Sequence, residues 1–450
     1  MFDGTRRGFL MGCSAAIANL AAARFTNLAF AGSGSSSDRD VLVVLFLRGG
    51  MDALSFVVPT GGPDRGHYET ARAQLRIPVS GTNAALPLGA LGNAAFGLHP
   101  AAASLHELYQ DRRVAFVHAC GMNTPSRSHF DTQLQIELGT PGASSTSDGW
   151  LTRHFLTAPG LPPDLVIPKL AVSDTIQTSW LSDLETVAMT DPGDFELNTG
   201  PSTWRVLQKI VLRNLLENPA FAGDFLHETG IQALDASTLV ESLTVLNGGY
   251  TPSNGAVYPS GGYGDALELV ARMVKADLGL QAATLDLGGW DTHNGQNGPG
   301  AGNYFHDRIR QLSDGLAALF LDLDGAAGQG TNYASRLTVV VMSEFGRRLR
   351  ENADRGTDHG HGSVLTVLGK GIRGGLYGDW PGLAPGQLYD GADLAVTTDY
   401  RRVLSELLVQ RLRNPNVDQV FPGYVYPGPL GLAPLFWDGF ESGDTSAWQP

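Results

Sequence analysis

The sequence predicts an α/β fold in which a mixed, mainly parallel central sheet lies between helices and carries one irregular insertion. Apolar runs rich in β-branched residues recur along the chain, as in buried parallel strands. Segments with a helical pattern lie between these runs, and such alternation favours a parallel sheet. The 57 glycines among 450 residues indicate a loop-rich chain rather than a helical bundle.

The predicted elements follow one another in this alternating order. The runs predicted as strands are 40–47, 114–119, 282–287, 336–342 and 364–368. The segments predicted as helices are 101–110, 130–138, 204–217, 265–280 and 304–323. The helices at 101–110, 265–280 and 304–323 each precede a predicted strand.

The N-terminal segment has the features of a twin-arginine export signal. Thr5-Arg-Arg-Gly-Phe-Leu10 precedes an Ala-rich apolar run, and Ala29-Phe30-Ala31 fits a cleavage site. The run is poorer in large apolar residues than a spanning helix, which needs about 20 apolar residues. We therefore expect residues 1–31 to direct export by the Tat machinery and to be removed by cleavage. The mature chain is expected in the periplasm or secreted, with no transmembrane helix.

The remaining chain is expected to form one large domain over residues 40–425. Within it, 141–259 is less regular and is interpreted as an insertion or cap. Residues 426–450 are interpreted as a linker followed by an acidic C-terminal tail.

Charge and cysteine content exclude some classes of protein. The formal net charge is −14, and loss of 1–31, with three Arg and one Asp, makes it about −16. No basic stripe offsets this charge, which argues against a nucleic-acid partner. The two cysteines are Cys13 and Cys120, so cleavage would leave Cys120 alone, as a buried small side chain.

Two short motifs, Gly288-Gly-Trp-Asp-Thr-His293 and Gly356-Thr-Asp-His-Gly-His-Gly362, concentrate imidazoles and carboxylates between glycines. Such side chains bind divalent cations such as zinc, manganese or calcium. Polar motifs also follow four predicted strands directly, where open α/β sheets bind their ligands. The predicted metal ligands are Asp52, Asp291, His293, Glu344, His359 and His361.

These carboxylates would repel one another without a cation, so the set predicts one or two divalent ions. Two ions about 3.5–4 Å apart would hold a phosphate-like group. Asp358 is either a further ligand or a partner that orients an imidazole. His129 and Arg347 are expected to lie around the site, and Arg347 is expected to pair with a carboxylate.

The segment Asn123-Thr-Pro-Ser-Arg-Ser-His129 opens a predicted helix. A hydroxyl there lies where backbone N–H groups favour an anion, so Ser126 or Ser128 is a candidate nucleophile or metal-bound hydroxyl. The alternative is that Ser is simply the helix N-cap. Arg127 and Arg48 are candidates to hold substrate oxyanions.

Five motifs together resemble the bacterial family called domain of unknown function 1501. They are Leu47-Arg-Gly-Gly-Met-Asp52, Ser126-Arg-Ser-His-Phe-Asp131, Gly288-Gly-Trp-Asp-Thr-His293, Met342-Ser-Glu-Phe-Gly-Arg347 and Gly356-Thr-Asp-His-Gly-His-Gly362. That family is similar to the alkaline phosphatase and sulfatase superfamily. The resemblance implies a three-layer alkaline phosphatase-like fold, a metal site at one sheet edge and hydrolysis of phosphate or sulfate esters.

Three positions bear on this resemblance. Asp52 stands where the superfamily has its first metal-binding Asp. Phe345 stands where an Asp-His pair has its His, and Asn123 takes the sulfatase nucleophile position. Because Asn cannot become formylglycine, phosphatase-like chemistry with a Ser nucleophile is favoured.

The sequence therefore predicts an exported metal-dependent hydrolase acting on a small anionic ester of phosphate or sulfate. The alternative is a non-catalytic secreted or envelope binding protein on the same scaffold, because a fold does not fix function.

Overall fold

The computed structural model describes residues 39–91, 95–143, 146–161, 165–195, 197, 200–218, 225–242, 249–325 and 332–434. The predicted signal peptide and the end of the predicted tail, from residue 435, lie outside these described residues.

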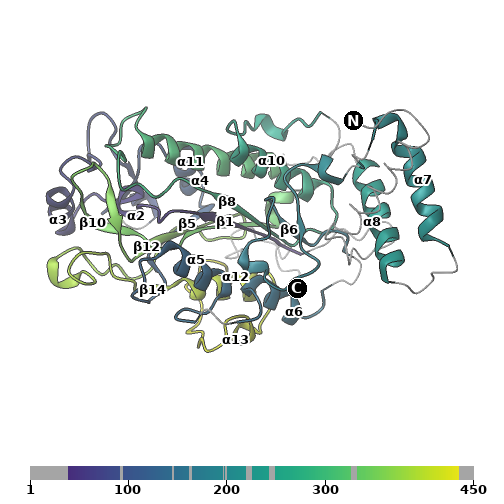
Figure 1. Cartoon of the computed structure of the whole chain (residues 1–450). Coiled ribbons are helices and arrows are strands. Elements are labelled where there is room, and N and C mark those ends of the chain that lie inside the picture. The colour runs from purple at the N-terminus through teal and green to yellow at the C-terminus, as the bar shows by residue number, and fades with distance from the viewer. Residues whose placement is uncertain are drawn as a thin grey trace, which may run out of the picture.

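A nine-stranded sheet forms the centre of the described chain (Figure 1). Its order is β13 (Gly375–Tyr377), β5 (Val114–Gly121), β12 (Ser363–Gly369), β9 (Leu337–Ser343), β1 (Val41–Leu47), β8 (Ala282–Leu287), β6 (Lys169–Ala171) and β7 (Val187–Ala188), with β14 (Thr398–Asp399) beside β5. β1 runs parallel to both β8 and β9, whereas β12 runs antiparallel to β5 and β9. The prediction of a mixed, mostly parallel sheet is confirmed.

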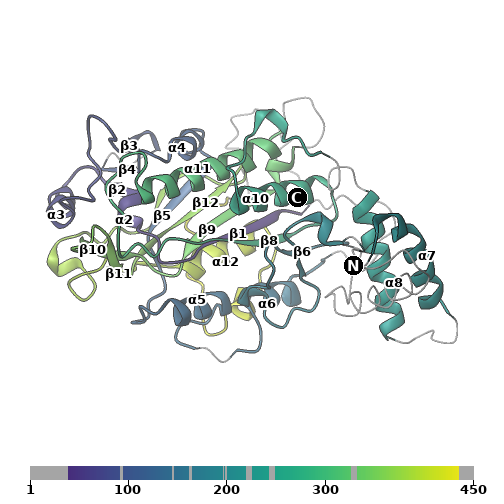
Figure 2. The same cartoon turned by 45° about the horizontal axis from the view of Figure 1, so that its top comes forward.

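Both faces of the sheet are covered, which explains why its strands are continuously apolar. Along β1, Val41, Val43 and Leu45 belong to one core, and Leu42 and Val44 belong to the other. The first core contains residues of α4 (Ala103–Gln110), α10 (Gly262–Lys275) and α11 (Tyr304–Leu323). The second contains residues of α5 (His129–Leu138), α6 (Trp150–Thr157), α12 (Tyr400–Gln410) and α13 (Val417–Val420). Figure 2 shows these two helical layers on either side of the sheet.

Smaller elements gather at one end of the molecule (Figure 1). They are α2 (Ala53–Phe56), α3 (Asp64–Ala71), a three-stranded sheet of β2 (Val57–Pro59), β4 (Phe96–Leu98) and β3 (Leu86–Pro87), and a pair of β10 (Arg347–Glu351) with β11 (Thr357–His359). The described chain as a whole also has short 3-10 turns, which are Gly89–Leu91, Thr178–Trp180, Pro192–Phe195, Ser202–Trp204, Ser253–Gly255, Tyr333–Ser335 and Pro385–Gln387.

The segment 141–259 is partly built into the main sheet, because it supplies β6 and the edge strand β7 as well as α6. Its helices α7 (Arg205–Leu216) and α8 (Phe225–Ser242) lie at the opposite end of the molecule from β10 (Figures 1 and 2). They therefore do not cover the end at which β10 and β11 lie. No helix in the described ranges is both long and apolar enough to cross a bilayer.

Candidate metal centre

Strands β1, β8 and β9 end side by side, since Leu47 is in register with both Leu287 and Ser343. The loops after these strands are therefore neighbours, although they come from distant parts of the sequence. They carry Asp52, the 288–293 motif and Glu344. The structure thus brings the polar motifs to one edge of the sheet, but it uses their side chains in different ways.

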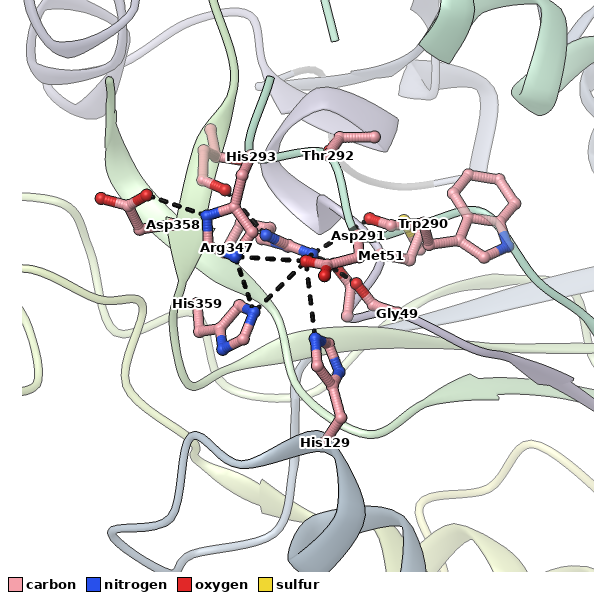
Figure 3. A network of polar contacts seen from close by, with 12 residues as sticks. Gly49, Met51, His129, Trp290, Asp291, Thr292, His293, Arg347, Asp358 and His359 are labelled. Carbon is pink, nitrogen blue, oxygen red and sulfur yellow. Dashed lines mark hydrogen bonds and ion pairs between the residues drawn. The ribbon is translucent and has the colours of Figure 1, made fainter. Parts of the chain in front are cut away.

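Four side chains meet at this edge, and we call them the Asp291 cluster: His129, Asp291, His293 and His359 (Figure 3). Oδ1 of Asp291 lies 3.5 Å from Nε2 of His129 and 3.2 Å from Nε2 of both His293 and His359. The Nε2 atoms of His293 and His359 are 2.9 Å apart. Ligand-capable atoms of His129, Asp291 and His359 all lie within 4.8 Å of one another.

The opposite nitrogen of each imidazole has a partner of its own. Nδ1 of His359 donates to the carbonyl of Arg127 over 2.8 Å. Nδ1 of His293 lies 3.0 Å from Oδ1 of Asp358, and Nδ1 of His129 lies 2.6 Å from Oε1 of Glu344. These acceptors favour a proton on Nδ1, which leaves the lone pair of each Nε2 in the cluster.

Glu344 is buried, and both of its carboxylate oxygens accept hydrogen bonds. Oε1 accepts from the Gly49 amide at 2.9 Å and from Gln133 at 2.7 Å, in addition to His129. Oε2 accepts from the Ser343 hydroxyl at 2.9 Å. Burial alone would raise the pKa of Glu344, but the hydrogen bond from His129 and its neighbours lowers it. The same bond raises the pKa of His129. Glu344 therefore orients His129 instead of joining the cluster as a ligand.

Arg347 is buried and holds three loops together. Its guanidinium donates to the carbonyls of Gly50 at 2.6 Å, Thr357 at 2.7 Å and Trp290 at 3.1 Å. It also donates to Oδ1 of Asp291 at 2.6 Å, the carboxylate pairing predicted from the sequence. Burial raises the pKa of Asp291, yet Arg347 outweighs it and the pKa falls to about 2. Asp291 therefore remains an anion over the whole range of useful pH.

A glycine is required at position 49, where the loop after β1 crosses the loop after β8. Gly49 has φ +122°, and a Cβ there would lie 2.4 Å from the amide nitrogen of Asp291. Any side chain would push the two loops apart. The Phe345 ring packs against His129 and His359, and its centroid lies 4.9 Å from the centroid of each imidazole. It acts as an apolar wall that fixes the two imidazoles.

Besides Glu344, two more predicted ligands lie outside the cluster because they have partners of their own. Asp52 is completely buried and forms a two-pronged ion pair with Arg72, at 2.5 and 2.9 Å, while Gln296 donates to it at 2.6 Å. His361 is buried and stacks on Tyr389, with centroids 4.1 Å apart. Burial lowers the pKa of His361 to about 4. Neither side chain belongs to the Asp291 cluster.

The candidate nucleophiles and oxyanion holders also have other contacts. Ser128 is the N-cap of α5, and its hydroxyl accepts from the Asp131 amide. The Ser126 hydroxyl accepts from the Ser128 amide at 3.2 Å. The Arg127 side chain pairs with Asp393 at 2.6 Å and with Asp390 at 3.0 Å. Arg48 pairs with Glu137 and, at 3.0 Å, with Asp286. The sequence made these guanidiniums candidates to hold substrate oxyanions, and in the structure both pair with carboxylates.

His129 is the residue whose importance the sequence understated. It was expected around the site, whereas its Nε2 points to Asp291 (Figure 3). The available signal was its place at the start of a helix after a strand, at the same edge as the other motifs. Gln133, one turn later on α5, was missed altogether.

The donor atoms of His129, Asp291 and His359 have the spacing expected of ligands to one metal ion. A tetrahedral zinc ion with bonds of about 2.0–2.1 Å separates its ligand atoms by about 3.3 Å. Oδ1 of Asp291 lies 3.2 Å from Nε2 of His359 and 3.5 Å from Nε2 of His129, which agrees with that value, and the ligand atoms of these three residues all lie within 4.8 Å of one another. His293 is not part of that mutually close set. Each imidazole also has the outer partner that metal-binding histidines usually have. His129, Asp291 and His359 therefore fit one ion with three protein ligands.

A family model described as "Protein of unknown function (DUF1501)" matches residues 253–414. The match supports that family, to which the motifs at 288–293, 342–347 and 356–362 pointed. Similarity to the alkaline phosphatase and sulfatase superfamily stays a prediction. Comparison with curated proteins and with solved structures gave no match.

Proposed function

We propose that this protein binds one divalent metal ion at the Asp291 cluster and uses it to hydrolyse phosphate or sulfate esters. The observation that carries the proposal is the arrangement of three Nε2 lone pairs around one carboxylate oxygen. Such lone pairs repel one another unless a cation or a proton lies between them. A second ion is not proposed, because Asp52 and His361 are engaged elsewhere.

The donor types favour zinc among the three metals expected from the sequence. Calcium takes oxygen ligands, and this cluster offers one carboxylate against three imidazoles. Imidazole suits zinc, which accepts mixed nitrogen and oxygen ligands in a tetrahedral site. Manganese prefers carboxylate and water ligands, so we expect it to bind more weakly.

The chain itself would supply charge, orientation and access. Glu344 and Asp358 hold two of the imidazoles in the required tautomer, and the Arg127 carbonyl holds the third. Asp291 and His293 have 49% and 44% of their side chains exposed, so an ester in solution can reach the cluster. A bound divalent ion supplies Lewis acidity and lowers the pKa of a coordinated water toward about 7.

A Ser nucleophile has less support than it had from the sequence, because both hydroxyls hydrogen-bond within the turn that starts α5. We therefore favour water as the nucleophile. The same observation favours the second candidate function, a non-catalytic secreted or envelope binding protein that keeps a metal ion for stability.

Metal analysis tests the first part of the proposal. Full-length protein folded with zinc should retain about one ion per chain. His129→Ala and Asp291→Asn should each weaken zinc binding at least tenfold, or about 1.4 kcal/mol. His361→Asn is the matched control, since His361 lies in the same motif as His359 but outside the cluster. Equal losses in His361→Asn and His129→Ala would contradict the assignment.

Turnover separates the two functions. Zinc-loaded protein would be assayed with p-nitrophenyl phosphate, bis(p-nitrophenyl) phosphate and p-nitrophenyl sulfate, beside folded Asp291→Asn. Activity present in the wild type and lost in Asp291→Asn supports a hydrolase. Zinc-dependent thermal stability without turnover of any ester supports the binding protein and overturns the hydrolase.

A further inference from the structure

A second concave site lies beside α11, apart from the residues of the Asp291 cluster. Its cavity has a volume of about 700 Å³, within the range of small-molecule sites. It is lined by the first half of α11, by the loop before that helix and by residues 259 and 260, which precede α10. Figure 2 shows α10 and α11 side by side in the helical layer on this face of the sheet.

Arg308 gives the cavity an unneutralised charge. Its Nη1 donates to Gln311 at 2.6 Å, and its carbon Cζ lies 5.8 Å from the centroid of the Tyr304 ring. Its Nε is buried and has no hydrogen-bond partner. No carboxylate of the described residues is within ion-pair distance of this guanidinium, in contrast to Arg310, which pairs with Asp307 at 3.4 Å.

The backbone around Arg308 is shaped to keep the guanidinium in place. A Cβ at Gly289 would lie 2.5 Å from Nη2 of Arg308 and 2.5 Å from the Tyr304 hydroxyl. Gly289 has φ +87°, which also suits glycine. The Tyr304 hydroxyl donates to the carbonyl of Gly289 at 2.9 Å. The cavity is thus built against the loop that continues to Asp291.

Other lining residues suit the hydroxyl groups of an anionic, hydroxylated ligand. The cavity is also lined by Gln311, Asn297 and Asp314, whose oxygens can accept from ligand hydroxyls. Asp314 already accepts from Ser104 at 2.7 Å, so its second oxygen is the one available.

We propose that this cavity, the Arg308 pocket, binds a small hydroxylated anion of the sugar-phosphate or sugar-acid class, with the anionic group on Arg308. The site does not depend on the proposed metal chemistry, because none of its lining residues belongs to the Asp291 cluster.

Calorimetric titration of metal-free protein with glucose 6-phosphate tests the proposal, with gluconate, glucose and inorganic phosphate as separate arms. Glucose 6-phosphate or gluconate should bind more tightly than glucose or phosphate, since the Arg308 guanidinium binds the anionic group and the other lining side chains bind the hydroxyls. Arg308→Gln should weaken that binding at least tenfold, about 1.4 kcal/mol, while Arg308→Lys retains part of it. Arg310→Gln is the matched control and should change binding less than threefold, because Asp307 already neutralises that charge.

Three results would overturn the proposal. One is no binding of either charged sugar up to about 10 mM, which would place any Kd well above 1 mM. Another is equal binding by wild type and a folded Arg308→Gln variant. The third is loss of binding in Asp291→Asn with Arg308 intact, which would place the anion at the Asp291 cluster. Because the titrations use metal-free protein, failure of the proposed hydrolase would leave their outcome unchanged.

Discussion

Replacing Asp52 by Asn should destabilise the fold without weakening metal binding. Asp52 and Arg72 are both fully buried and are joined by two hydrogen bonds of 2.5 and 2.9 Å. The variant leaves the Arg72 charge buried without its counter-ion. Removing one partner of such a pair typically costs about 3–5 kcal/mol. We expect a value near the lower end, since Asn can still accept one hydrogen bond.

The ion pair also makes stability depend on pH in a defined direction. Burial raises the pKa of Asp52, but Arg72 and the Gln296 hydrogen bond outweigh burial and lower it. The unfolded value is about 3.9. The contribution of this carboxylate is therefore complete above that pH and is lost as the pH falls through the folded value. Asp52→Asn should lack this part of the acid-induced loss of stability.

Urea unfolding and zinc titration measure the two effects separately. Asp52→Asn should shift the unfolding midpoint and leave zinc affinity within about threefold of wild type. Adding Arg72→Met should cost less than the sum of the single changes, because the two groups are coupled. An unchanged unfolding midpoint together with a zinc affinity lowered tenfold or more would refute this reasoning, since Asp52 would then act as a ligand.

Three further changes probe the surroundings of the cluster and the core. Glu344→Gln should weaken zinc binding about 10–100-fold in a chelator competition, because the carboxylate no longer orients His129; unchanged affinity would contradict that role. Gly49→Ala should lower both thermal stability and zinc affinity, because its Cβ would lie 2.4 Å from the next loop; wild-type values for both would contradict the close approach. Burial raises the pKa of the Cys120 thiol, so in a Cys13→Ser variant no thiol should react with Ellman's reagent until the protein is unfolded. Rapid reaction of native protein would show that Cys120 is exposed.

The central fold could be predicted because its signals are local. The run that forms β1 is apolar at every position, and alternate residues fill the cores on the two faces of the sheet. The boundaries of α11 agree with the predicted 304–323, because its apolar face repeats with the helical period over twenty residues. The place of β6 and β7 in the main sheet could not be predicted, since these strands have only three and two residues.

The sequence also indicated which edge of the sheet holds the polar motifs, because motifs that follow parallel strands share that edge. The sequence could not predict which of these side chains form the cluster and which pair with other residues. Asp52 and Asp291 both follow a strand, yet one is neutralised by Arg72 inside the core and the other lies half exposed among imidazoles. Arg72 is 20 positions away from Asp52 and lies on another element, so no local pattern distinguishes the two carboxylates.

The same limit explains why the sequence favoured His361 over His129 as a member of the cluster, whereas the structure places His129 in it and His361 outside it. An imidazole is a good metal ligand when one nitrogen is held by an acceptor and the other is free to face the ion. For His129 that acceptor is Glu344, 215 residues away in the sequence. His361 lies two residues beyond the end of β11, stacks on Tyr389, and its Nε2 has no partner among the described residues. Histidines that look equally suited to bind a metal ion in the sequence therefore differ in what binds the second ring nitrogen, and that partner is set by the tertiary fold.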